Sequence, residues 1–142
     1  MEKQTAWIND LLDAAREDPT RSVGSLIECC GKGCAVQNGH LEGVKALSAG
    51  ASACKTRSDR VAFLRANFPF KVSEADDGIV IHLGKEKCTC PMSPEVSGPM
   101  LCNCTLGHVK AFWSAVFGKE VDAEIVESFQ RGGKDCVIKL ML

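Results

Sequence analysis

The residues best suited to chemistry are two pairs of cysteines, Cys88/Cys90 and Cys102/Cys104, each pair separated by one residue. On a strand or in a tight loop, side chains two positions apart can point the same way. Two such pairs supply four thiolates, which complete a tetrahedral zinc shell and suit an iron–sulfur cluster equally well. The spacing therefore predicts a metal site that takes zinc or an iron–sulfur cluster as its cofactor.

Three further cysteines are predicted to face the same core. Cys30 and Cys34 fall on the apolar stripe of a helix, and Cys136 alternates with apolar residues in the last strand. We expect Cys136 to be a further metal ligand and Cys30 and Cys34 to be cofactor-binding residues, although the spacing leaves open which subset forms the site. Because a free cysteine also behaves as a small hydrophobic residue, a purely structural, cysteine-packed domain is an alternative.

Cys104 and His108 form a candidate catalytic pair. Cys104 lies at or next to the start of a helix, where free N–H groups and the helix dipole stabilise a thiolate, so its pKa is predicted to be low. His108 follows at the i+4 spacing that suits a shared ligand or a Cys/His pair, although a histidine that packs the helix is the simpler interpretation. The sequence lacks a Gly-x-Ser-x-Gly elbow, a Walker loop and a dinucleotide fingerprint, so a binding domain is favoured over an enzyme.

Composition narrows the class of protein and its partners. The 142 residues are 45% hydrophobic and 25% charged, which fits one domain over residues 1–142. A net charge of -1 without a dense Lys/Arg run argues against nucleic acid as a partner. No stretch approaches the roughly 20 apolar residues of a membrane span, and the N-terminus lacks a signal core, so we expect a cytoplasmic protein that does not enter a membrane. In a reducing compartment, clustered cysteines indicate metal ligands or redox groups before disulfides.

The elements that must position these residues change in type along the chain. Apolar periodicity predicts four helices in a helical part of about residues 5–69. A part with a sheet and a helix follows at about 76–142: a strand at 79–83, a loop at 91–101, a helix from about Leu106 that Gly118 ends, and strands at 121–129 and 136–142 that form an antiparallel hairpin. The fold class is therefore α+β.

Two glycines stand out in the second predicted helix. Gly31 and Gly33 each weaken a helix by about 1 kcal/mol relative to alanine. Their presence predicts that the backbone of this helix approaches another part of the molecule closely.

Several motifs resemble an uncharacterised prokaryotic cysteine-rich family. They are the run from Leu101 to Gly107, the helix to Phe117-Gly118, Glu127-Ser128, the run from Gly132 to Cys136, and a Cys-Gly-x-x-Cys-Ala signature carried here by Cys30 to Ala35. Together the matches span residues near 28 to 136. The resemblance assigns the chain to a family without giving it a biochemical role.

The segment from Cys102 to Cys136 is more distantly similar to the 4-vinyl-reductase domain, a small-molecule-binding module that often holds a structural zinc. This resemblance implies an antiparallel sheet of about four strands backed by helices, a homodimer, and a pocket for a small apolar ligand. Ser128 stands where that domain usually has another cysteine, and His108 stands where an aromatic residue is common. A weaker similarity to amino-thiazoline-carboxylate hydrolase-like proteins supplies the enzyme alternative, a thiol-dependent hydrolase that uses Cys104.

Overall fold

The computed structural model describes residues 3–37, 39, 41–84, 86–88, 90 and 98–142. The helices are α1 (Lys3–Glu17), α2 (Val23–Gln37), α3 (Val44–Ala53), α4 (Arg57–Asn67) and α5 (Cys102–Phe117), with short 3-10 turns η1 (Pro99–Leu101) and η2 (Phe129–Arg131). The strands are β1 (Lys71–Ala75), β2 (Gly78–His82), β3 (Asp122–Glu127) and β4 (Val137–Met141). The predicted α+β class and the helical first half of the chain are confirmed.

The strands form one antiparallel sheet in the order β1-β2-β4-β3. The predicted hairpin of β3 and β4 is present, with Ile125 opposite Ile138 and a bulge between Ile125 and Glu127. Strand β2 pairs with β4 along its whole length. These two strands are far apart in sequence, and together they form the middle of the sheet. A bulge bends its strand and re-aims the side chains that follow, here Glu127 and Ser128.

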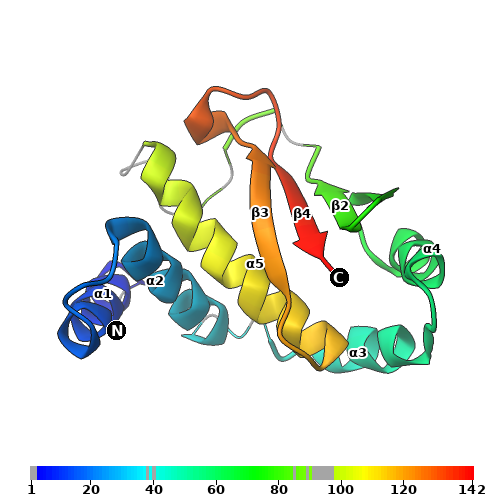
Figure 1. Ribbon diagram of the computed structural model, residues 1–142, viewed down its shortest axis with the longest axis horizontal. Helices are drawn as coiled ribbons and strands as arrows, with labels where there is room; N and C mark the ends of the chain where they lie inside the picture. The colour runs from blue at the N-terminus through cyan, green and yellow to red at the C-terminus, as the bar shows by residue number, and fades with distance from the viewer. Residues whose placement is uncertain (1–2, 38, 40, 85, 89, 91–97) are drawn as a thin grey trace.

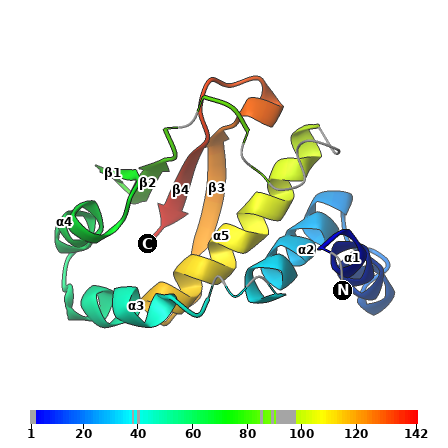
Figure 2. The ribbon, with the colours of Figure 1, turned by 180° about the vertical axis from the view of Figure 1, so that it is seen from behind.

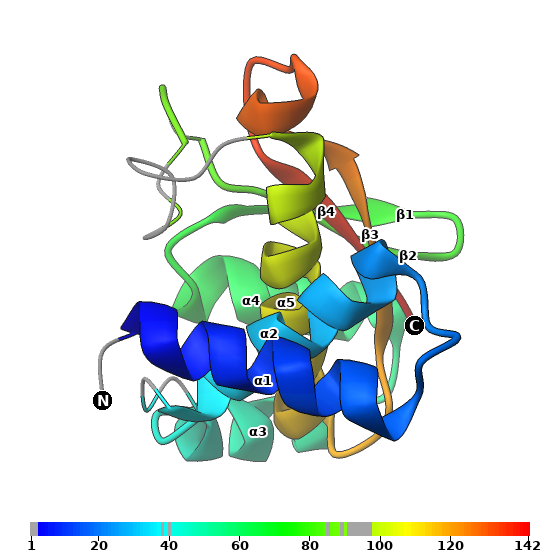
Figure 3. The same ribbon diagram turned by 90° about the vertical axis from the view of Figure 1, so that its left-hand side faces the viewer.

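Helix α5 lies between the sheet and the first two helices (Figures 1 and 2). Figure 3 shows α1 and α2 in front of α5, on the side away from the sheet. The close approach predicted for Gly31 is confirmed: a Cβ there would collide with the backbone carbonyl of Cys104. Gly107 makes the reciprocal approach to the backbone of Glu28, and so the backbones of α2 and α5 are in direct contact. Gly33 instead makes room for the side chain of Asp10 on α1.

The apolar core lies between α5, α3, α4 and the sheet. Its buried members on α5 are Val109, Trp113 and Val116, and they pack against β2 and β4 residues such as Ile79 and Leu140. An edge-to-face contact between Phe68 and Trp113, with ring centroids 5.1 Å apart, joins the end of α4 to this core. The core therefore surrounds the C-terminal two-thirds of α5 and leaves its first turn outside.

Two predictions about the elements are wrong. The sequence pattern does not predict strand β1, because only Val72 in it is buried and its neighbours Lys71, Ser73 and Glu74 are polar, as suits an edge strand. Helix α5 begins at Cys102 rather than near Leu106, since η1 leads directly into it. Cys102 and Cys104 are consequently both in the first helical turn, not in a strand or loop. Residues 91–97 of the predicted loop lie outside the described residues.

Candidate functional site

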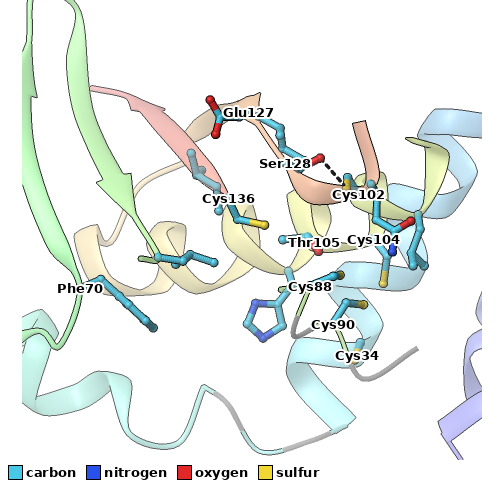
Figure 4. Close-up of a pocket in the computed structure, with 16 residues that line it drawn as sticks. Cys34, Phe70, Cys88, Cys90, Cys102, Cys104, Thr105, Glu127, Ser128 and Cys136 are labelled. Atoms are coloured by element: carbon cyan, nitrogen blue, oxygen red, sulfur yellow. Dashed lines mark hydrogen bonds between the residues drawn. The ribbon is translucent and has the colours of Figure 1, made fainter. Parts of the chain in front are cut away.

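A pocket of about 450 Å³ opens beside the first turn of α5 (Figure 4). Its walls come from α2, the chain after β2, α5, the end of β3 and the start of β4. Six cysteines line it: Cys34, Cys88, Cys90, Cys102, Cys104 and Cys136. Segments separated by up to 102 positions in sequence therefore contribute thiols to one cavity.

The structure brings most of the predicted site residues together. Every one of the five predicted metal ligands lines the pocket, and so do Cys34 and His108. Cys30 does not line it: the side chain is fully buried, and its thiol donates to the carbonyl of Leu26 at 3.4 Å. Among the described residues, no group of three or more histidine, cysteine, aspartate or glutamate side chains is arranged to hold a metal ion as it stands.

Cys102 and Cys104 have different surroundings although they are two residues apart. Trp7 on α1 donates its indole N–H to the sulfur of Cys104, with Nε1 3.3 Å from Sγ. The thiol of Cys102 instead donates to the hydroxyl of Ser128, at 3.1 Å. Positions i and i+2 of an α-helix are separated by about 200° around the axis, so the two sulfurs project from different sides of α5. The expectation that this pair points the same way is wrong because the pair is helical.

Burial raises the pKa of three cysteines at or near the start of α5, namely Cys30, Cys104 and Cys136. Burial raises the pKa of Cys104 from the ordinary 9.0 to about 11, and only part of that rise is offset by the hydrogen bond from Trp7. The neighbouring thiols of Cys34 and Cys90 raise it further. Burial also raises the pKa of Cys136 and brings that of Cys30 to about 12. The predicted low pKa of Cys104 is therefore wrong, since the loss of water around the thiol outweighs the effect of the helix terminus.

Sequence reasoning missed two residues that touch the thiols. Trp7 is 97 positions from Cys104, and no local pattern could have revealed their contact. Ser128 stands where the 4-vinyl-reductase domain usually has a cysteine, and here it is buried and accepts a hydrogen bond from the thiol of Cys102. Glu127 also lines the pocket, and its Oε2 accepts hydrogen bonds from the backbone N–H groups of Lys134 and Asp135 at 3.1 and 2.8 Å. That carboxylate holds the turn before β4.

A second, apolar hollow of about 540 Å³ adjoins the thiol pocket. Its walls are mainly aromatic and aliphatic, including Phe68, Phe112 and Trp113. Five residues line both hollows: Phe70, Leu83, Thr105, His108 and Ile138. His108 therefore stands at the boundary between a compartment rich in thiols and one that is almost wholly apolar.

Comparison by sequence identifies the family. Residues 20–142 match the family described as "Family of unknown function (DUF6144)". The chain belongs to this family. The expected assignment to an uncharacterised family is thereby confirmed, and helix α1 with Trp7 lies before the matched residues. No curated protein matches the sequence.

Comparison by structure finds a likeness in fold. A trafficking protein particle complex subunit 3 from Naegleria fowleri, covalently bound to palmitic acid, matches with a TM-score of 0.51. The match covers 99% of this chain and 96% of that chain at 11% sequence identity. At such low identity the likeness shows a shared fold. No helix in the described part of the chain is long and apolar enough to cross a membrane.

Proposed function

We propose that this protein is a metal-binding domain in which thiolates of the cysteine-lined pocket hold zinc or an iron–sulfur cluster. The observation that carries the proposal is the convergence of six cysteines, from four separate segments, on one cavity. Thiolates are the ligands that zinc and iron–sulfur clusters share. A bound metal would also offset the cost of ionising thiols whose pKa burial raises, because a thiol must lose its proton to become a ligand.

Packing alone accounts poorly for these cysteines. Among the described residues, Cys30, Cys102 and Cys104 are buried, but the contiguous apolar cluster around Trp113 includes no cysteine. Four of the pocket thiols, those of Cys34, Cys88, Cys90 and Cys136, belong to residues that are only partly buried. A cysteine used as a small hydrophobic residue is expected in the core instead.

The described residues include all nine cysteines, and no disulfide joins any of them. Free thiols fit the reducing cytoplasm, which we also propose as the location of the protein.

The apolar hollow supports a second part of the proposal, a small apolar ligand held beside the metal. Ligand pockets are mostly apolar cavities of about 300–1,000 Å³ with a few polar groups, and the two adjoining hollows fit this description. The trafficking-complex subunit that shares the fold is covalently bound to palmitic acid. The narrower likeness to the 4-vinyl-reductase domain, and the homodimer that it implies, belong to the same proposal.

The thiol-dependent hydrolase is the weaker candidate. Cys104 and His108 do line the same pocket. A nucleophilic cysteine needs a thiolate near neutral pH, however, and burial raises the pKa of Cys104 to about 11. If metal-free protein were alkylated at Cys104 faster than a free thiol at pH 7, the enzyme would become the better proposal.

Metal analysis of intact protein tests the metal site. The protein is purified anaerobically, and zinc, iron and acid-labile sulfide are measured per chain. We expect at least about one equivalent of metal, reduced in Cys104→Ser and unchanged in Cys54→Ser, whose cysteine lies outside the pocket. Less than about 0.2 equivalents of any metal, in protein also reconstituted with zinc or with iron and sulfide, would contradict the proposal.

A competition experiment tests the apolar ligand separately. A fluorescent naphthalene sulfonate is bound to the protein and then displaced with palmitate or with a small aromatic acid. Leu83 lines both hollows, so Leu83→Arg should abolish binding of the probe. Val126→Arg is the matched control, because Val126 is 58% exposed. Equal probe binding by both variants would show that the hollows are not the ligand site.

A further inference from the structure

The six pocket thiols fall into two groups, one on either side of the first turn of α5. The helical positions of Cys102 and Cys104 direct their sulfurs apart by about 200°. Each sulfur also has its own hydrogen-bond partner, the Ser128 hydroxyl for Cys102 and the Trp7 indole for Cys104. These two partners come from different sides of the molecule, since Trp7 belongs to α1 and Ser128 follows β3. One ion cannot readily take both cysteines of this pair.

The first group, called here the Cys104 set, consists of Cys34, Cys90 and Cys104. In Figure 4 the side chain of Cys104 points toward Cys90 and Cys34. Both of these thiols interact electrostatically with Cys104. The contact of the α2 and α5 backbones at Gly31 and Gly107 explains why Cys34, one turn further along α2, reaches this side of α5.

The second group, called here the Cys136 set, consists of Cys88, Cys102 and Cys136. Cys136 interacts electrostatically with both other members. The chain leads from Ser128, the partner of Cys102, through the turn to Cys136, which immediately precedes β4, so these residues share one wall of the pocket. Cys88 and Cys90 are therefore divided between the two sets, as Cys102 and Cys104 are.

We infer that the pocket binds two metal ions, one on the Cys104 set and one on the Cys136 set, instead of one ion on the two Cys-x-Cys pairs. This inference rests on the proposed function. Each set supplies three thiolates, and each thiol releases its proton on binding. Three protein ligands leave the fourth position of a tetrahedral ion for a molecule from the pocket. Binding has to bring the three sulfurs of a set to about 4 Å from one another, as expected for bonds of about 2.3 Å to a shared ion.

Stoichiometry with Co²⁺ and Zn²⁺ tests the division. Metal-free, reduced protein is titrated with each ion alone, and thiolate-to-cobalt absorption and bound metal are measured. We expect about two equivalents in the unmodified protein and about one after a single substitution in either set. Cys90→Ser and Cys34→Ser should remove the same ion, while Cys88→Ser and Cys136→Ser should remove the other. Combining Cys90→Ser with Cys88→Ser should remove both, whereas Cys90→Ser with Cys34→Ser should leave one.

The controls separate this inference from the proposed function. Cys29→Ser and Cys54→Ser change cysteines outside the pocket and should keep two equivalents. One equivalent that is lost in all four single variants would overturn the division but keep the metal site, and so would one iron–sulfur cluster lost in all of them. Absence of metal from the unmodified protein would overturn both. Because each set is tested by two variants, a variant that fails to fold by circular dichroism still leaves one test.

Discussion

Helix α5 passes through two regions with different environments, an apolar core and a pocket lined by thiols. Around Val109, Trp113 and Val116 it is enclosed by apolar side chains of the sheet and of α3 and α4. Around Cys102 and Cys104 it borders a cavity and is contacted by polar groups, the Trp7 indole and the Ser128 hydroxyl. The core therefore stabilises α5 through its later turns, and the first turn presents thiols to a cavity instead of packing in the core.

The largest expected effect is on the core. Trp113→Ala should lower the free energy of unfolding by about 4 kcal/mol, because it empties a large site that is 3% exposed. Urea denaturation of metal-free protein measures the loss. Val126→Ala, at a 58% exposed position, should change stability by no more than about 0.5 kcal/mol. A loss below about 1 kcal/mol for Trp113→Ala would show that the core does not depend on this residue.

The buried thiols should make the metal-free protein sensitive to high pH. The pKa of Cys104 is about 11 in the fold against an ordinary 9.0, so between these values the unfolded chain ionises while the folded thiol stays protonated. The contribution is complete below pH 9, and stability should fall by about 2 kcal/mol as pH rises to 11. Unfolding of the unmodified protein and Cys104→Ala at pH 8, 9, 10 and 11 measures it. An identical slope in both would contradict the assigned role of Cys104.

The close contact between α2 and α5 should be sensitive to the addition of a single methyl group. Gly107→Ala places a Cβ against the backbone of Glu28, so α2 and α5 must separate, at a cost of about 2 kcal/mol. The same movement should weaken metal binding by the Cys104 set, because Cys34 is on α2. Gly43→Ala is the matched control, since nothing lies within 4 Å of a Cβ there. Unchanged metal affinity in a destabilised Gly107→Ala would separate packing of the helices from assembly of the site.

The smallest effect is expected for the hydrogen bond from α1. Trp7→Phe removes the indole N–H that contacts Cys104 and should weaken metal binding about fivefold, the equivalent of about 1 kcal/mol. Isothermal titration with Zn²⁺ against a competing chelator measures the change. Ile8→Ala on the same helix, at a 50% exposed position, should leave affinity unchanged. If both variants weaken binding equally, the effect comes from the helix and not from the N–H group.

The sequence predicts those features of the core and of the pocket that depend on local patterns. Apolar periodicity located the core face of α5, and the positions of Cys34 and Cys136 in their own elements were enough to direct both toward the pocket. The failures depend on contacts between distant residues. The extension of α5 back to Cys102 turns a pair expected to act together into two cysteines with different partners, and Trp7 reaches the site from the other end of the chain. Edge strand β1 has too few buried residues to be distinguished from a loop.

The protein has two tryptophans, and they lie in different regions: Trp113 in the core and Trp7 against Cys104. The fluorescence of each tryptophan therefore reports on a different region of the protein. In Trp113→Phe the remaining fluorescence comes from an indole in contact with a pocket thiol, and cobalt loading should quench it. In Trp7→Phe it comes from an indole among apolar side chains, and its wavelength follows unfolding. The two variants together give separate optical records of metal loading and of global unfolding in the same chain.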